Sequence, residues 1–270
     1  MTDTLIKVAA AQILVEGGAP AANLRRAVAA IATAAHSGCQ LVVLPECLDL
    51  GWTHPSARGD AEPIPGPRCE QLSRAAADHR VLVAAGLTER DGSRIYNAAV
   101  LLGPAGELLL KYRKINELEI AHDLYAIGDR LAVAHTALGT IGLNICADNF
   151  PNALDIGRTL GRMGAQLLVS PSAWAVDADH DNQAQPYGNL WRDAYATLAR
   201  QFQMPVVGVS SVGPLDAGPW TGRKCIGCSL VIDKQGREVM MGPYGEPAVL
   251  GAELTISSGT AQGTAISGML

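Results

Sequence analysis

Three apolar runs in the sequence each lead into a residue that can take part in catalysis. LVVLPE ends at Glu46, LLLKYRK ends at Lys114, and IGLNIC ends at Cys146. In layered α/β folds, ligands bind at the loops that follow strands. A carboxylate, an ammonium and a thiol placed at three such points can therefore converge on one site.

This trio suits acyl transfer to water. A free thiol is mostly protonated at neutral pH, and a carboxylate can remove its proton as a general base. An ammonium, helped by the backbone N–H of Ala147, can stabilise the oxyanion of a tetrahedral intermediate, and the thioester product would then be hydrolysed. Taken singly, each residue has an ordinary explanation: Glu46 as a solvated loop acid, Lys114 as an exposed cation and Cys146 as a buried core thiol.

Apolar runs and helix-like segments alternate along the chain. The pattern predicts strands over 6–13, 40–44, 81–86, 98–103, 108–112, 133–136, 141–145, 166–170, 205–210, 228–232, 238–241 and 248–254. It predicts helices over 21–36, 69–79, 153–163 and 190–203. Three strand pairs flank short glycine-containing turns and predict hairpins. Together these elements predict a layered α/β fold, with two mixed sheets face to face and helices outside.

The chain carries no linker rich in Pro, Gly or Ser that would divide it. We therefore expect a single domain over residues 1–270. Residues 255–270 are rich in Gly, Ser and Thr. This segment has little apolar area of its own, so we expect a C-terminal tail that is extended or docked on a partner.

Composition narrows the classes of function. Of the 270 residues 48% are hydrophobic, which is enough for a large core, and the formal net charge is −5 without any long basic run, which argues against nucleic-acid binding. No window holds the roughly 18 consecutive apolar residues of a membrane span, and no basic lead precedes the first apolar stretch, so neither a membrane span nor a signal peptide is expected. Six cysteines are too few for a disulfide scaffold and indicate reduced thiols in the cytoplasm.

Three motifs in fixed order carry a family resemblance. LPE at 44–46, YRKI at 112–115 and ICADN at 145–149 together resemble the nitrilase or carbon–nitrogen hydrolase superfamily, in its amidase-like branch. The resemblance runs from Ile6 to about Leu254 and includes AAQ at 10–12, SPSAW at 170–174 and CSLVIDKQG at 228–236. It implies a four-layer αββα sandwich and a Glu–Lys–Cys triad.

The resemblance also assigns roles. It implies Glu46 as the base, Lys114 as the oxyanion stabiliser and Cys146 as the nucleophile. It implies no cofactor and no metal, because the triad supplies base, electrophile and nucleophile. By analogy with the family, a homo-oligomer, dimer or larger, is expected.

Many family members carry a second glutamate between the lysine and the cysteine, which helps to position the substrate. The family spacing would place it near Ala121, which is not acidic. Glu117 and Glu119 are the nearby candidates, and of these we favour Glu119.

Candidates for the substrate pocket lie after the nucleophile and in the SPSAW motif: Ala147, Asp148 and Trp174. Asp148 has an alternative role, because its carboxylate could hold the loop through hydrogen bonds to backbone N–H groups. Weaker candidates for the pocket wall are Trp52 and the pair Tyr96-Asn97.

The resemblance implies hydrolysis of a small amide, with release of ammonia and a carboxylic acid. The family's nitrilases typically have Trp-Glu after the cysteine, so Ala147-Asp148 favours amides over nitriles. Members that act on N-carbamoyl compounds often carry arginines there; this chain has 149–151 as Asn-Phe-Pro, although Arg158 is near. A non-catalytic binding protein with the same fold is the alternative from another class, and loss of a triad residue would support it.

Two further clusters suggest a function, but each also has an ordinary structural explanation. Cys225 and Cys228 form a CxxC, but no second ligand pair is evident, and redox CxxC motifs begin helices whereas this one leads into a predicted strand. Residues 177–181, DADHD, are similar to a metal-binding run. We expect them to form a polar loop near the mouth of the site.

Overall fold

The computed structural model describes residues 3–258 and consists mainly of two six-stranded sheets. In spatial order the first sheet contains β15 (Ala248–Ile256), β1 (Thr4–Gln12), β2 (Leu41–Val43), β3 (Leu82–Asp91), β4 (Arg94–Leu102) and β5 (Leu108–Arg113). The second contains β14 (Glu238–Met241), β13 (Leu230–Ile232), β10 (Val206–Ser210), β8 (Leu167–Ser172), β7 (Gly139–Leu143) and β6 (Val133–Thr136). A small third sheet joins β11 (Val212–Pro214), β12 (Lys224–Ile226) and β9 (Ala175–Val176).

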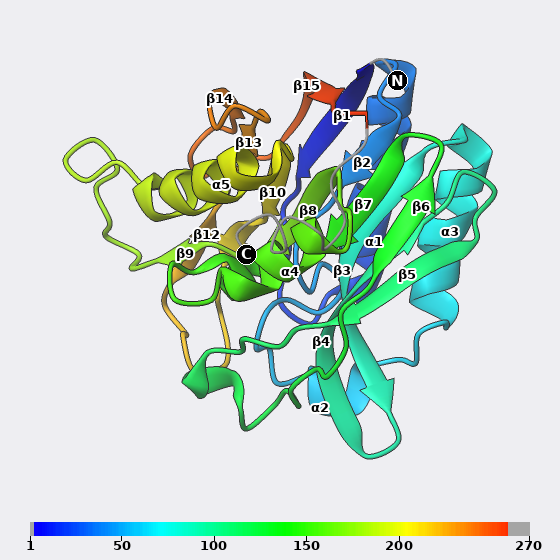
Figure 1. Cartoon of the computed structure of the whole chain (residues 1–270). Coiled ribbons are helices and arrows are strands. Elements are labelled where there is room, and N and C mark those ends of the chain that lie inside the picture. The colour runs from blue at the N-terminus through cyan, green and yellow to red at the C-terminus, as the bar shows by residue number, and fades with distance from the viewer. Residues whose placement is uncertain (1–2, 259–270) are drawn as a thin grey trace.

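Helices cover the outer faces of the two large sheets (Figure 1). The first sheet is covered by α1 (Pro20–His36) and α3 (Pro67–His79), and the second by α4 (Asp155–Arg162) and α5 (Asn189–Phe202). Three short helical segments, α2 (Ala57–Asp60), η1 (Glu119–Ala121) and η2 (Cys146–Asn149), lie in connections. The expected four-layer αββα architecture is confirmed.

Burial on both faces explains the continuous apolar strands. In β1, Ile6, Val8 and Ala10 belong to the core that the two sheets share, whereas Ala9 and Ala11 belong to the core beneath α1 and α3. Because successive side chains of a strand point to opposite faces, a strand covered on both sides must be apolar throughout. The same rule applies to β2, which is apolar throughout, and the polar residue Glu46 follows only after this strand has ended.

The four main helices begin and end close to their predicted limits. Pro20 and Pro67 occupy the first turns of α1 and α3, where the missing N–H of proline costs no hydrogen bond. In α5, Trp191, Tyr195 and Leu198 recur at helical spacing and are buried against the second sheet. The helix therefore carries large aromatic side chains inward.

Some elements differ from the prediction. The strand expected to end at Gly86 continues in β3 to Asp91, because the charged residues read as a loop are paired within the sheet: Glu89 accepts from Lys111 and Arg113 of β5 at 2.6 Å each. The small third sheet was not predicted, because its strands are only two or three residues long.

The last strand, β15, ends at Ile256 and so runs two residues into the tail expected over 255–270. Thr255 and Ile256 belong to β15, where they pair with Leu5 and Thr4 of β1. That boundary was wrong because the ladder, and not the local composition, determines where the strand ends. The remainder of the expected tail from residue 259 lies outside the described residues.

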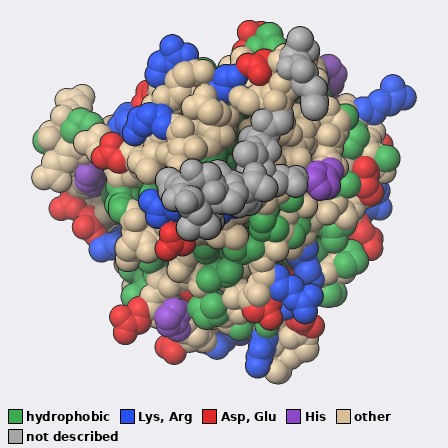
Figure 2. Space-filling model, in the orientation of Figure 1, with side chains coloured by type: hydrophobic (Ala, Val, Ile, Leu, Met, Phe, Trp, Pro, Cys, Tyr) green, Lys and Arg blue, Asp and Glu red, His purple; other side chains and the backbone are tan. Residues whose placement is uncertain are grey.

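Charged side chains of both signs are interspersed over the face seen in Figure 2. Within residues 3–258, no helix is both long enough and apolar enough to cross a membrane.

Candidate active site

The structure brings Glu46, Lys114 and Cys146 together around one cavity of about 430 Å³. Glu46 lies in the connection that follows β2, Lys114 comes directly after β5, and Cys146 opens η2 after β7. The first two residues come from the first sheet and the third from the second, so the face-to-face packing of the sheets closes the site.

Lys114 and Glu46 form a buried ion pair. The Lys114 Nζ lies 2.8 Å from Oε1 of Glu46, and both side chains are 1% exposed. The Asn97 side-chain amide donates to the same Oε1 at 2.6 Å. Among the described residues the other oxygen, Oε2, has no hydrogen-bond partner, so one carboxylate oxygen is held and the other is left to accept a proton.

Glu117, and not the favoured Glu119, lies beside the lysine. The Oε2 of Glu117 is 3.5 Å from Lys114 Nζ, and the residue is buried, whereas Glu119 is exposed at the start of η1. The structure therefore places Glu117, and not the favoured Glu119, in contact with Lys114. Glu117 is not among the described residues that line the cavity, so its contact is with the lysine.

Burial and charge set the protonation states of this cluster. Burial alone would lower the pKa of Lys114, but the carboxylates of Glu117 and Glu46 raise it well above its ordinary value, so the ammonium stays charged. Burial also raises the pKa of Glu117 to about 7, against the opposing attraction of Lys114. The cluster therefore holds one fixed cation and a second carboxyl group that titrates near neutral pH.

Cys146 lies at a strained turn between a strand and a short helix. Its φ is +43°, in the left-handed region that side chains other than glycine adopt rarely. Its N–H donates to Ser170 Oγ at 3.2 Å, and its carbonyl oxygen accepts from the Asn149 side chain at 3.3 Å. Strain retained by such contacts is typical of residues whose side chain must be aimed at a ligand.

The Cys146 thiol is neutral at rest. Burial raises its pKa well above the ordinary value, and the nearby Glu46 carboxylate adds to the rise, whereas Lys114 opposes it. A buried thiol of this kind needs a base to become a nucleophile, and Glu46 lines the same cavity.

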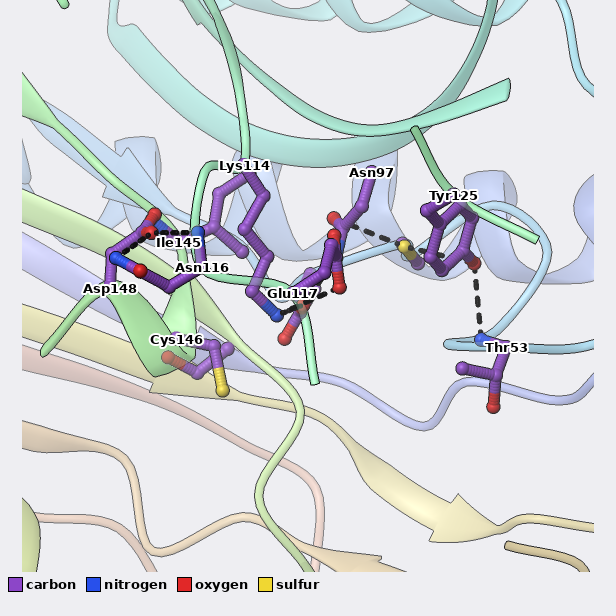
Figure 3. A network of polar contacts seen from close by, with 12 residues as sticks. Thr53, Asn97, Lys114, Asn116, Glu117, Tyr125, Ile145, Cys146 and Asp148 are labelled. Atoms are coloured by element: carbon purple, nitrogen blue, oxygen red, sulfur yellow. Dashed lines mark hydrogen bonds and ion pairs between the residues drawn. The ribbon is translucent and has the colours of Figure 1, made fainter. Parts of the chain in front are cut away.

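Asp148 holds the loop of Cys146 and is not among the described residues that line the cavity. Its carboxylate accepts hydrogen bonds from the backbone N–H groups of Ile145 and Asn116, at 2.9 Å each (Figure 3). It also accepts one from the Tyr112 hydroxyl at 2.8 Å. It is therefore not a pocket residue, but joins the segment after β5 to the loop of Cys146. Ala147, the other candidate after the nucleophile, does line the cavity.

Aromatic side chains form much of the remaining wall. Trp174 and Trp52 line the cavity, whereas Tyr96 is absent from the described lining residues and instead stacks under Arg113, whose guanidinium carbon is 3.9 Å from the ring centroid. Asn97 is connected to the site by the hydrogen bond that its side-chain amide donates to Glu46. Four aromatic residues of the wall were not predicted: Phe150, Tyr187, Trp191 and Trp220.

The two other clusters that the sequence suggested, residues 177–181 and the pair Cys225 and Cys228, lie in a loop and in the protein interior. The loop over 177–181 lies beside the site, since His180 lines the cavity, and Asp177 pairs with Arg223 at 2.9 Å. Cys225 lies in β12, and both it and Cys228 are buried free thiols. Within residues 3–258, no group of three or more His, Cys, Asp or Glu side chains could hold a metal ion.

Solved structures resemble this fold closely. The carbon–nitrogen hydrolase from Helicobacter pylori G27 has a TM-score of 0.82 at 22% identity, covering 93% of this chain and 89% of that chain. A mutant of the amidase from Nesterenkonia sp. AN1, in which acrylamide has added to the active-site cysteine, has a TM-score of 0.77 at 21% identity, covering 92% of each chain. At these identities the likeness concerns the fold.

The relatives found by sequence are named as amidases and as a nitrilase. Omega-amidase NIT2 from Xenopus tropicalis is 33% identical over 162 residues, 56% of this chain, and the match spans 58% of that relative's length. A nitrilase from Pyrococcus abyssi (strain GE5 / Orsay) is 30% identical over 258 residues, covering 93% of this chain and 90% of that protein. The carbon–nitrogen hydrolase family model matches residues 7–262. The chain belongs to the carbon–nitrogen hydrolase family.

Proposed function

We propose that this protein hydrolyses the carbon–nitrogen bond of small amides through a thioester on Cys146. The observation that carries the proposal is the meeting of a buried thiol, a paired ammonium and a carboxylate with one free oxygen around a single cavity. The omega-amidase and amidase relatives support amide substrates at the level of the family.

Acylation begins when the Cys146 sulfur attacks the amide carbon while Glu46 takes the thiol proton. The Lys114 ammonium stabilises the oxyanion that forms, and we propose the N–H of Ala147, the next residue along the cavity wall, as a second donor. Glu46 then gives its proton to the amide nitrogen, the carbon–nitrogen bond breaks, and ammonia leaves. The acyl group remains on sulfur as a thioester.

Deacylation reverses these roles with water. Glu46 takes a proton from the water, whose oxygen attacks the thioester carbon, and Lys114 again stabilises the oxyanion. The carbon–sulfur bond then breaks, the thiolate recovers the proton from Glu46, and the carboxylic acid is released. We propose that Glu117 acts through Lys114, by holding the ammonium in place, because it contacts the lysine and not the cavity.

Ammonia release from a panel of amides tests this proposal. The wild type should release one ammonia per acid formed, and Cys146→Ala should release none. Cys69→Ala removes another buried thiol, in α3, and should behave as wild type. Acid and ammonia formed by Cys146→Ala at the wild-type rate would rule out the thioester route.

Nitrile hydrolysis is the second candidate, because a relative that matches over 93% of this chain is a nitrilase. A nitrile would add the Cys146 sulfur to its carbon to give a thioimidate; one water would then release ammonia and leave a thioester, and a second water would release the acid and the thiol. We rank amides first because Ala147-Asp148 follows the cysteine. Turnover of nitriles, with none of the matching amides, would reverse that order.

N-carbamoyl compounds rank lower, since no arginine is among the described residues that line the cavity. A binding protein without catalysis would leave every compound in the panel unchanged.

We further propose a cytoplasmic homo-oligomer. Six free thiols favour a reducing compartment. Ile120, Ile127 and Leu190 are large apolar side chains that are more than a third exposed, and contact between copies would cover such groups. Light scattering after size exclusion gives the mass in solution, and a monomer would contradict the oligomer.

A further inference from the structure

The tryptophans of this chain are gathered around one cavity. The chain has four, and only 4% of its residues are Phe, Trp or Tyr. All four line the cavity that holds Cys146, together with Phe150 and Tyr187: Trp52, Trp174, Trp191 and Trp220. Trp174 and Trp191 also belong to the core that the two sheets share, and Trp52 belongs to a smaller core against which Trp220 packs, so the cavity lies where these two cores meet the wall.

The rings form two groups in the wall, one stacked and one edge to face. Trp191 stacks on Trp174, with centroids 4.9 Å apart and planes 17° from parallel, and on Phe150 at 5.3 Å. Trp52 meets Trp220 edge to face at 5.0 Å, and its ring centroid is 6.0 Å from Lys114 Nζ. The wall therefore offers flat apolar surfaces next to the catalytic ammonium, the kind of surface on which an aromatic ring packs well.

Among the described lining residues, Lys114 and His180 are the basic side chains. Lys114 is paired with Glu46 and Glu117, and no arginine is among the described lining residues. A carboxylate on the acyl group would leave water for an aromatic cavity that offers it no free lysine or arginine and only the His180 imidazole as a basic group, which is unfavourable.

The wall does offer neutral hydrogen-bond donors. Trp174 and Trp52 are 1% and 4% exposed, and within residues 3–258 the Nε1 of each indole is buried without an acceptor. A buried donor without a partner favours a ligand that brings a neutral acceptor.

Resting on the proposed amide hydrolysis, we infer that the substrate is an amide whose acyl group carries an aromatic ring and no charged group. The tryptophan wall binds the ring, the indole N–H groups donate to neutral acceptors on it, and the absence of a free lysine or arginine among the described lining residues disfavours a second carboxylate. This substrate class differs from amides of dicarboxylic acids, whose distal carboxylate would enter the aromatic cavity.

Two matched pairs of amides test the effect of an aromatic ring and the effect of a charge on kcat/KM separately. 3-Phenylpropionamide should exceed butyramide in kcat/KM by about tenfold or more, because only the former covers the aromatic wall. 3-(4-Nitrophenyl)propionamide and 3-(4-carboxyphenyl)propionamide have nearly the same shape and differ in charge. The nitro compound should be favoured by about tenfold or more. Equal values for either pair, or a preference for the carboxylate, would overturn the inference.

Binding to Cys146→Ala tests the pocket without catalysis. Calorimetry should give a lower Kd for 3-phenylpropionamide than for butyramide, and tryptophan fluorescence should change on binding, because every tryptophan lines the cavity. If the wild type hydrolyses no amide but this binding order is found, the proposed function fails and the inferred pocket stands. If amides are hydrolysed but succinamate is the best substrate and binder, the inferred class fails alone.

Trp220→Leu and Phe202→Leu form a matched pair of variants. Trp220 is half-buried and lines the cavity, whereas Phe202 is half-buried at the end of α5 and is not among the lining residues. The ratio of kcat/KM for 3-phenylpropionamide over butyramide should fall about fivefold in Trp220→Leu and stay unchanged in Phe202→Leu. An unchanged ratio in Trp220→Leu, with a folded protein by circular dichroism, would count against the aromatic wall as the specificity determinant.

Discussion

The charged and the aromatic side chains around the Cys146 cavity are held in different ways. Each charged group has specific polar partners: Glu46 is held by Lys114 and Asn97, and Lys114 also by Glu117. The aromatic groups are held by stacking on one another, as Trp191 is between Trp174 and Phe150. Polar contacts fix a geometry to within tenths of an ångström, whereas stacking allows rings to slide. The charged cluster therefore suits fixed chemistry, and the aromatic wall suits a choice of substrate.

This comparison makes a general prediction for the variants below. Changes in the charged cluster should lower kcat/KM by a similar factor for every amide, since the reaction itself is impaired. Changes in the aromatic wall should alter the ratios between amides. A charged-cluster variant that changed the ratios would break the distinction.

The largest effect is expected at Lys114. Lys114→Met leaves the buried carboxyl groups of Glu46 and Glu117 without their cation, which should lower the free energy of unfolding by about 3–5 kcal/mol. Loss of the oxyanion stabiliser should lower kcat/KM by about 10³-fold. Urea unfolding and ammonia release measure the two effects.

Lys111→Met is the matched control. Lys111 pairs with Glu89, which keeps Arg113 as its partner, so stability should change by only about 0.5 kcal/mol. Similar losses in the two lysine variants would contradict the special position of Lys114.

Glu46→Gln should affect activity almost as strongly. Glutamine can still accept the Asn97 hydrogen bond but cannot take the thiol proton, so kcat/KM should fall by about 10²- to 10⁴-fold, the usual contribution of a general base. Glu70→Gln, on the exposed side of α3, should have no effect. A Glu46→Gln enzyme that kept its rate would assign the base to another group.

Glu117 should produce a pH-dependent difference in stability. Its pKa is about 7 in the folded protein against 4.5 for an ordinary glutamate. The folded state therefore keeps a proton that the unfolded chain has lost, so the stabilisation is complete below pH 4.5 and disappears as pH rises through 7. Relative to Glu117→Gln, the wild type should lose about 3 kcal/mol of unfolding free energy between pH 4.5 and pH 8.

Urea unfolding of both proteins across this range measures the difference, and the other titrating groups cancel in the comparison. A constant difference would mean that Glu117 is ionised throughout.

The smallest effect is expected at Asn97, which acts through Glu46. Asn97→Ala removes one of two donors to Glu46 Oε1, so the carboxylate remains but is less well placed. We expect kcat to fall about tenfold, in line with one hydrogen bond to a charged group, and KM to change little. A rise in KM with unchanged kcat would show that Asn97 acts on the substrate and not on the base.

The sequence predicted most of the framework because the central strands of the two large sheets lie between two apolar layers. Continuous runs such as Leu41–Leu44 are what burial on both faces requires, and three of the catalytic candidates follow such runs. Glu89 shows the limit: its charge ended the predicted strand at Gly86, although its partners on β5 make a charged strand residue favourable.

The rest of the site depends on contacts that no local pattern reports. Glu117 and Glu119 lie two residues apart in an irregular segment, and only the turn after β5 decides which one reaches Lys114. Trp191 reads as ordinary core because it lies on the buried face of α5, and its place in the wall depends on Trp174, which comes from a different part of the chain. Motifs with fixed spacing were therefore predictable, but the pocket was not.

Intact-mass spectrometry on a single turnover tests the central claim most directly. The wild type is mixed with excess 3-phenylpropionamide, quenched in acid within milliseconds, and then digested to locate any added mass. The account predicts a gain equal to the acyl group, confined to the peptide that contains Cys146 and absent from Cys146→Ala. Turnover with no adduct on Cys146, or an adduct that persists in Cys146→Ala, would contradict it.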